Sequence, residues 1–234
     1  MEETKKYRHE YKYMVSTGQL EILKARAQAV MQRDCHVRKE GPFAGYYNIR
    51  SVYFDDLADT CYLENESGTD PREKFRIRIY NHSDERISLE LKSKRAGMCR
   101  KQSCPLTREQ AKILLKGECL PEEKTYPPIL NKLLYQIKTR GLHPVVIVEY
   151  DRSPFVYPVG NVRVTLDMNI SASKECQRFF DGNLPLRPIL GLGQHILEVK
   201  WDELLPDHIY HAMDLQNLQW TSFSKFYLCR RFSR

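Results

Sequence analysis

The residues with the clearest chemical potential are the cations of one alternating stretch, Arg72 to Lys94. Side chains on a β-strand point to opposite faces with a period of two residues. The stretch therefore predicts a hairpin that turns at 81–84, with one apolar face and one face dense in cations. The polar face carries Arg72, Lys74, Arg76, Arg78, Tyr80, Glu90, Lys92 and Lys94, and the apolar face carries Phe75, Ile77, Ile79, Ile87, Leu89 and Leu91. Such a concentration of one charge sign favours a polyanionic ligand.

The same alternation recurs elsewhere in the chain, and cations occur on several of the polar faces. The further predicted strands are 7–15, 46–55, 98–104, 145–152, 155–158, 161–170 and 194–202. The cations that we place together are Lys12, Arg76, Arg78, Lys92, Lys101, Arg152, Arg163 and Lys200. If the sheet closes, these side chains line a lumen, where unpaired charges are very costly, and a chain of phosphates would neutralise them. An open sheet with one solvated face is the alternative interpretation.

Helices are predicted beside these strands. Ser16 or Thr17 caps the first helix, and Thr107 starts another that ends at Lys116-Gly117. Helical spacing also occurs at 129–139, at 207–218 and after Ser224-Lys225, whereas 33–44 is predicted to be a loop. The expected fold is α+β, a closed antiparallel barrel of about eight strands with flanking helices. We expect a single domain that spans 1–234.

Composition narrows the class of protein. The chain has 234 residues, 41% of them hydrophobic and 29% charged, which is typical of a globular protein, and its net charge of +7 favours an acidic partner. The first residues are charged, and no apolar run approaches the roughly 20 residues that span a bilayer. We therefore expect no membrane segment and a cytoplasmic location. The seven cysteines contain no CxxC pair, so reduced thiols are expected and neither a zinc site nor a disulfide framework is indicated.

Eight short motifs in a fixed order give the chain a resemblance to a known family. They are RHEYKY (8–13), YNIRSVYFD (47–55), KFRIRIY (74–80), LELKSK (89–94), VEYDR (148–152), VRVTLD (162–167), ILEVK (196–200) and FSKF (223–226). Together they resemble the VTC domain, the polyphosphate polymerase domain of the vacuolar transporter chaperone family, within the CYTH-like triphosphate tunnel metalloenzymes. The resemblance implies a tunnel of antiparallel strands in which the γ-phosphate of ATP is transferred to a growing polyphosphate.

The resemblance also implies roles for individual residues. Catalysis would involve Arg76, Arg78, Lys92 and Glu198, and Glu198 would hold a divalent metal, Mn²⁺ or Mg²⁺. The implied phosphate contacts are Lys12, Arg76, Arg78, Lys92, Lys101, Tyr150, Arg152, Arg163, Ser224 and Lys225. Lys94 and Lys200 are added as lumen cations from strand parity alone. One departure stands out, because Arg8 occupies the first Glu position of the ExExK pattern of tunnel triphosphatases, which disfavours plain hydrolysis.

Each of these roles has a structural alternative. Glu198 could pair with Lys200 or Arg163, Tyr150 could be a core residue, Ser224 could cap a helix, and Glu10 and Glu90 could be salt-bridge partners of the cations. Asp167 is a candidate second metal ligand. Arg50 fits a structural salt bridge as well as a ligand contact, and His208 and His211 fit an exposed helix face better than a metal site.

Three functions compete with an ATP-dependent polyphosphate polymerase. The first is a tri- or polyphosphatase that uses the same residues, and the second is a polyphosphate- or nucleotide-binding module without catalysis. The third, a nucleic-acid-binding barrel, is disfavoured because the aromatic residues largely share the apolar faces. The expected partners are therefore ATP and inorganic polyphosphate. Because no membrane segment is expected in this chain, export of a product would need a membrane-protein partner.

Overall fold

The structure is a computed structural model that describes residues 7–121 and 125–233. The chain forms two compact units, which are described here separately. Unit 1 comprises the described residues of Met1–Asn48, Tyr150–Ile170 and Leu190–Phe223. Unit 2 comprises the described residues of Ile49–Glu149, Ser171–Ile189 and Ser224–Arg234. The prediction of a single domain stays a prediction.

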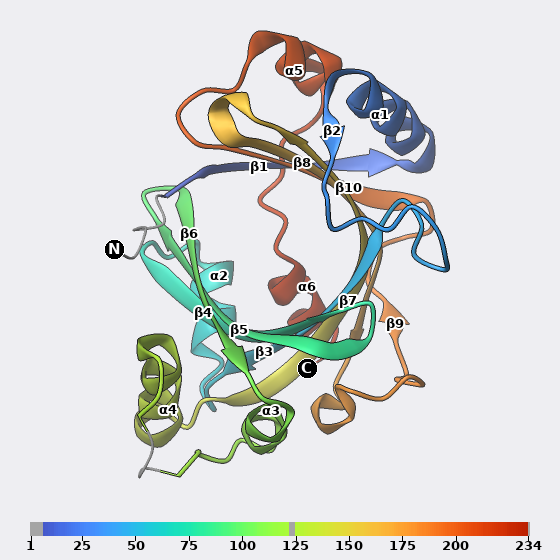
Figure 1. The fold of residues 1–234 in the computed structure, drawn as a ribbon. Coiled ribbons are helices and arrows are strands. Elements are labelled where there is room, and N and C mark those ends of the chain that lie inside the picture. Colours follow the sequence, from blue (N-terminus) through green and yellow to red (C-terminus); the bar gives the residue numbers. More distant parts are fainter. Residues whose placement is uncertain (1–6, 122–124, 234) are drawn as a thin grey trace. The chain divides into compact units, whose positions relative to one another are not determined.

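One antiparallel sheet contains all the described strands, with the order β1-β10-β8-β7-β3-β4-β5-β6 (Figure 1). Two short strands lie off this path, since β2 pairs with β7 and β9 pairs with β8. The strands are β1 His9–Ser16, β2 Gln32–Arg33, β3 Tyr47–Asp55, β4 Arg72–Tyr80, β5 Ser83–Arg95, β6 Met98–Leu106, β7 His143–Tyr157, β8 Val162–Ser173, β9 Arg187–Pro188 and β10 Gln194–Trp201. The antiparallel α+β fold with flanking helices is confirmed.

The predicted closure of the barrel is wrong. β1 and β6 end the strand order, and within 7–121 and 125–233 they do not pair with each other. Alternation reveals which face of a strand is polar, but it carries no information about pairing between the two edge strands. The sequence also missed β2 and β9, which are each two residues long, and it divided β7, which runs unbroken from His143 to Tyr157.

The helices are α1 Thr17–Val30, α2 Thr60–Glu66, α3 Arg108–Leu115, α4 Pro128–Arg140, α5 Asp207–Ala212 and α6 Lys225–Arg231, with 3-10 turns η1 Val159–Asn161, η2 Cys176–Arg178 and η3 Leu215–Asn217. Ser16 caps α1 as predicted, because its Oγ accepts a hydrogen bond from Gln19 N at 3.3 Å. Thr107 caps α3 in the same way. The predicted helix 207–218 is wrong in length, since Asp214 adopts a φ of 53° and separates α5 from η3.

The core of unit 1 lies between its strands and the helices α1 and α5, which lie beside each other in Figure 1. Tyr13 and Val15 of β1 are buried against Leu20 and Leu23 of α1. These two strand residues belong to the predicted apolar parity. Burying one side of β1 leaves the opposite parity, with Glu10 and Lys12, on the other face of the same strand.

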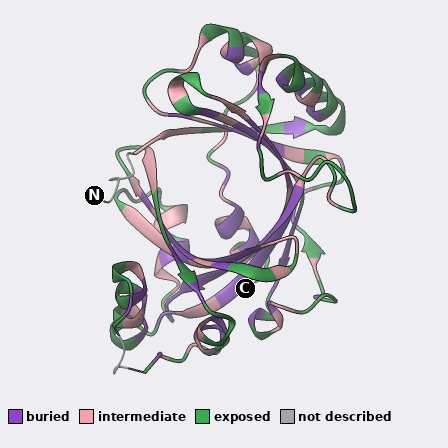
Figure 2. Ribbon diagram, in the orientation of Figure 1, coloured by how far each residue is buried: buried purple, intermediate pink, exposed green. Residues whose placement is uncertain are grey.

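The core of unit 2 lies between the β4–β5 hairpin and the helices α3 and α4. The predicted apolar face of the hairpin is buried here and includes Phe75, Ile77 and Leu89. Asn81 and His82 form the tight turn, and both have a positive φ. Figure 2 shows buried residues in purple along these strands. Because the apolar parity faces the core, the cationic parity must lie on the opposite face of the hairpin.

Candidate functional site

The cationic face of unit 2 converges on one buried carboxylate, that of Glu90 in β5. Glu90 is 2% exposed and lies opposite Arg76 in the β4–β5 register. Arg76 donates to Glu90 Oε2 through Nε at 2.7 Å and through Nη2 at 2.6 Å, and Lys101 Nζ donates to Oε1 at 2.9 Å. Arg78 Nη1 lies 3.5 Å from Oε2. Three cations thus share one carboxylate, and charges of +3 and −1 leave this group at +2.

Strand β3 adds two hydroxyl groups to this set. Arg76 Nη1 donates to Tyr53 Oη at 2.7 Å, and Arg78 Nε donates to Ser51 Oγ at 3.0 Å. Burial raises the pKa of Tyr53, but the charges of Arg76 and Arg78 outweigh burial and lower that pKa below its ordinary value. Burial also raises the pKa of Glu90, and the same two arginines with Lys101 bring it well below its usual range. Both shifts indicate a strongly positive electrostatic potential on this face.

Lys92 and the start of α6 border the Glu90 group. Lys92 lies opposite Lys101 in the β5–β6 register, and its charge contributes to the lowered pKa of Tyr53. The ring of Phe226 in α6 contacts the Tyr53 ring, with centroids 5.2 Å apart. This contact brings the neighbouring Lys225, which is buried, to the same part of unit 2. Ser224 Oγ accepts a hydrogen bond from Tyr227 N at 3.3 Å, so its alternative role as a helix cap is confirmed.

A second group of charges lies in unit 1 and is centred on Arg152. Arg152 makes two hydrogen bonds to Asp167, at 2.6 and 2.7 Å, and its Nη2 lies 3.6 Å from Glu198 Oε2. Its guanidinium also lies over the ring of Tyr150, 5.2 Å from the centroid. Burial lowers the pKa of Arg152, but Asp167 outweighs it and raises that pKa well above the ordinary value. Asp167 is therefore primarily an ion-pair partner, and Tyr150 is buried under the guanidinium of Arg152.

Strands β1 and β10 complete the Arg152 group with a chain of ion pairs. Lys200 Nζ contacts Glu198 Oε1 and lies 3.6 Å from Glu10 Oε1, while Lys12 Nζ lies 3.4 Å from the same Glu10 oxygen. Burial raises the pKa of Glu198, and Lys200 more than compensates, so that pKa lies below its ordinary value. The pairing of Glu198 with Lys200 is confirmed. Three cations, Lys12, Arg152 and Lys200, face three carboxylates, Glu10, Asp167 and Glu198, so the formal charges of +3 and −3 cancel.

Arg163 makes its ion pair outside both the Glu90 group and the Arg152 group. Its Nη2 donates to Asp34 Oδ2 at 2.9 Å and to Tyr47 Oη at 2.7 Å. The alternative pairing of Arg163 with Glu198 is therefore wrong. Lys200 is its neighbour in the β8–β10 register, which keeps Arg163 on the same face as the Arg152 group.

Glu10 and Glu198 are suited to a hard divalent cation by donor type, because Mg²⁺ and Mn²⁺ prefer carboxylate oxygens. Thr165 lies opposite Glu198 in the β8–β10 register, and its buried Oγ1 has no hydrogen-bond partner among the described residues. An orphaned hydroxyl opposite a carboxylate fits a place where a bound ion would bring its own polar ligands. Arg8, which replaces a Glu in the tunnel pattern, instead pairs with Asp202 at 2.6 Å.

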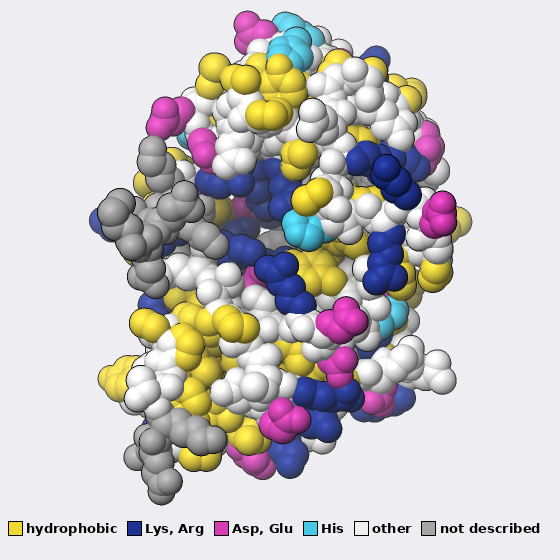
Figure 3. All heavy atoms as spheres, viewed as in Figure 1, with side chains coloured by type: hydrophobic (Ala, Val, Ile, Leu, Met, Phe, Trp, Pro, Cys, Tyr) yellow, Lys and Arg dark blue, Asp and Glu magenta, His cyan; other side chains and the backbone are white. Residues whose placement is uncertain are grey.

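Other sequence predictions are resolved more simply. Arg50 is 1% exposed and bonded to Glu149 at 2.5 Å, so its structural role is confirmed. His208 and His211 are exposed on α5, and Figure 3 shows histidine side chains in cyan at the surface of this region. Sequence reasoning missed Ser51 and Tyr53, although they share one parity in β3 and parity could have identified them.

Comparison with known proteins gives one family and a common fold. The family model described as the VTC domain matches residues 7–233. Curated proteins give no match. Among solved structures, a Bacillus halodurans protein described as a candidate adenylate cyclase has a TM-score of 0.51 and 16% identity, over 92% of this chain and 89% of that one. The Hippeastrum protein HpAC1, described as a candidate adenylyl cyclase with a dominant triphosphatase activity, has a TM-score of 0.52 and 13% identity, over 97% of both chains. None of the described helices is long and apolar enough to cross a membrane.

Proposed function

Because the chain belongs to the VTC-domain family, we propose that it is a polyphosphate polymerase that transfers the γ-phosphate of ATP to inorganic polyphosphate. The observation that carries this proposal is the charge of the Glu90 group. Three cations surround a single buried carboxylate, and Lys92 lies on the adjacent position of the same strand face. Phosphate oxygens suit such a concentration of cations, since arginine binds them with two parallel hydrogen bonds.

Phosphoryl transfer relies mainly on positioning and on stabilisation of charge. In our proposal, Arg76, Arg78 and Lys92 hold phosphates and stabilise the charge that develops in transfer. The terminal oxygen of a phosphate acceptor is already ionised near neutral pH, so its attack needs no general base. Further phosphate contacts are proposed for Lys12, Lys101, Tyr150, Arg152, Arg163, Ser224 and Lys225. Ser224 would act through its hydroxyl in addition to capping α6.

Glu198, with Glu10 beside it, would hold the divalent metal. A bound Mn²⁺ or Mg²⁺ would neutralise charge on phosphate oxygens. The protein's own contribution is to keep Glu198 ionised, since the neighbouring Lys200 lowers the pKa of this buried carboxyl. Lys200 contacts both carboxylates and would have to move when a metal binds between them.

The test is ATP turnover with Mn²⁺, with polymer, ADP and orthophosphate measured separately. A polymerase produces ADP and long polymer together. Release of orthophosphate without polymer would show that the protein is a tri- or polyphosphatase and not a polymerase. Tight binding of polyphosphate without any turnover of ATP would show that the protein is a binding module without catalytic activity.

Variants connect this activity to the Glu90 group. Arg78→Gln should lower the turnover number by about 10²–10³-fold, which is the usual cost of removing one donor that stabilises a transition state. Arg72→Gln is the matched control, because Arg72 lies on the same strand and donates to Thr69 O instead of the Glu90 group. Equal activities of the two variants would argue against a catalytic Arg78. Glu198→Gln should abolish the dependence on Mn²⁺ concentration.

A further inference from the structure

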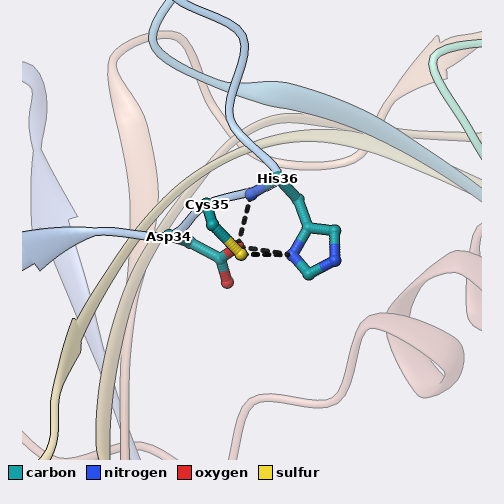
Figure 4. A group of neighbouring side chains, drawn as sticks. All are labelled: Asp34, Cys35 and His36. Carbon is teal, nitrogen blue, oxygen red and sulfur yellow. Dashed lines mark hydrogen bonds and ion pairs between the residues drawn. The ribbon is translucent and has the colours of Figure 1, made fainter.

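Three consecutive residues at the end of β2 direct their side chains toward one point in unit 1 (Figure 4). His36 Nδ1 lies 2.8 Å from Asp34 Oδ1 and 3.5 Å from Cys35 Sγ. All three donor atoms lie within 4.8 Å of one another. Asp34 is buried, whereas Cys35 and His36 are exposed. The site is therefore anchored on one side and open to solvent on the other.

The geometry distinguishes this group from a catalytic triad. In a Cys-His-Asp triad the thiol contacts one ring nitrogen and the carboxylate contacts the other, so that the imidazole relays a proton between them. Here the thiol and the carboxylate both face Nδ1 of His36. A relay is impossible with this arrangement. Convergence of sulfur, nitrogen and oxygen on one point is instead what a metal ion requires.

The distances are close to those around a tetrahedral ion. With bonds of about 2.3 Å to sulfur and about 2.0–2.1 Å to nitrogen or oxygen, the sulfur–nitrogen distance is about 3.6 Å and the nitrogen–oxygen distance about 3.3 Å. The sulfur–nitrogen distance here is 3.5 Å. The nitrogen–oxygen distance is 2.8 Å, as expected while a proton bridges these two atoms. Replacing that proton requires a separation of about half an ångström, which a small rotation of the exposed His36 ring provides.

A supporting partner already orients the carboxylate. Arg163 Nη2 binds Asp34 Oδ2 at 2.9 Å, which leaves Oδ1 directed at His36, and the same nitrogen also binds Tyr47 Oη. Outer partners of this kind fix the ligands of metal sites.

We propose that Asp34, Cys35 and His36 form a binding site for a divalent metal ion of the zinc type, with one position open to water or another ligand. A thiol and an imidazole select Zn²⁺ or Co²⁺ over Mg²⁺ and Mn²⁺, so this site differs in its preferred ion from the carboxylates Glu10 and Glu198. Binding forms a metal–sulfur bond and breaks the S–H bond, and the thiol proton leaves to solvent. The proton between His36 Nδ1 and Asp34 Oδ1 moves to Nε2, so that His36 binds the metal through Nδ1 as a neutral imidazole.

Cobalt titration of the full chain tests the site, because Co²⁺ bound to a thiolate gives a charge-transfer absorption and Zn²⁺ displaces it. We expect one equivalent to bind. Removing a residue that only orients a metal ligand typically costs about 10–100-fold in affinity. Because Cys35 and His36 would bind the metal directly, Cys35→Ser and His36→Gln should each weaken Zn²⁺ binding by more than about 100-fold. Both side chains are exposed, and the far-ultraviolet circular dichroism of the variants should match that of the wild type.

Cys119→Ser is the matched control, since this partly exposed free thiol lies in unit 2 and should not affect binding. The proposal is overturned if the wild type shows no charge-transfer band. It is also overturned if Cys35→Ser binds Zn²⁺ as tightly as the wild type does. A loss of binding in Cys119→Ser equal to that in Cys35→Ser would likewise contradict it. The polymerase assay is independent of all three outcomes.

Discussion

Replacing Glu90 by Gln tests how the cations of unit 2 are held together. The substitution keeps the shape of the side chain but removes the only carboxylate that Arg76, Arg78 and Lys101 share among the described residues. An amide oxygen can still accept from Arg76, but the amide nitrogen cannot accept from Lys101. Removing one member of a buried ion pair typically costs about 3–5 kcal/mol. Because Glu90 is 2% exposed, we expect Glu90→Gln to lower the free energy of unfolding by that amount.

Thermal and urea unfolding measure this effect. For a chain of this size, about 1 kcal/mol corresponds to about 2–4 °C, so the melting temperature should fall by roughly 6–20 °C. Glu85→Gln is the control, because Glu85 is exposed on the same strand and should leave stability unchanged.

Tripolyphosphate should reverse part of the loss. A ligand at about 100 times its Kd adds about 2.7 kcal/mol of stability. Without the Glu90 charge, the phosphates should bind Glu90→Gln about tenfold more tightly, which is about 1.4 kcal/mol. The melting temperature of the variant should therefore rise more with tripolyphosphate than that of the wild type. Equal stability of the two proteins, or an equal rise, would refute the idea that the Glu90 carboxylate holds these cations together and competes with phosphate for them.

Three further outcomes are expected. Asp167→Asn removes the charge that faces Arg152 and one of the two hydrogen bonds, because the amide nitrogen cannot accept. It should cost about 3–5 kcal/mol in urea unfolding, and wild-type stability would show that this buried pair contributes no net stability. The pKa of Glu90 is depressed in the folded state, so its contribution to stability is present above the ordinary pKa of 4.5 and is lost as pH falls through the folded pKa. Glu90→Gln should therefore flatten the acid side of a stability–pH profile, and an unchanged slope would contradict this. Gly160→Ala should lower stability by more than about 2 kcal/mol, because φ is 70° and the new Cβ would overlap a main-chain oxygen. Gly18→Ala, in open space on α1, should instead raise it by about 0.5–1 kcal/mol, and similar values for the two would refute the steric argument.

Strand parity predicted much of this fold because parity is a local property. Burial of Phe75, Ile77 and Leu89 follows from alternation alone, and so does the grouping of Arg76 with Glu90 on the opposite face. Alternation shows which side of a strand is apolar, and that apolar side then packs against the core. These predictions needed no information about distant segments.

The missed features depend on contacts between segments that are far apart in sequence. Asp34 lies in a stretch predicted as a loop, and it acquires its role from Arg163, 129 residues later in the chain. Closure of the sheet likewise depends on whether β1 meets β6, which no local pattern encodes. For the ion pair of Glu198, the sequence left Lys200 and Arg163 as candidates, and only the contacts of Arg163 with the distant Asp34 and Tyr47 decided between them.

The Arg152 group of unit 1 and the Glu90 group of unit 2 differ in the balance of their charges, and this difference bears on which of them binds phosphate. In unit 1, Lys12, Arg152 and Lys200 are matched by three carboxylates, so the charges satisfy one another without a ligand. In unit 2, Arg76, Arg78 and Lys101 all contact the one carboxylate of Glu90, so the formal charges of these four residues sum to +2. Phosphate oxygens would add negative charge at the point where these three cations meet. We therefore expect a phosphate to bind first at the Glu90 group, and we expect Lys200 to move before a metal ion binds Glu10 and Glu198.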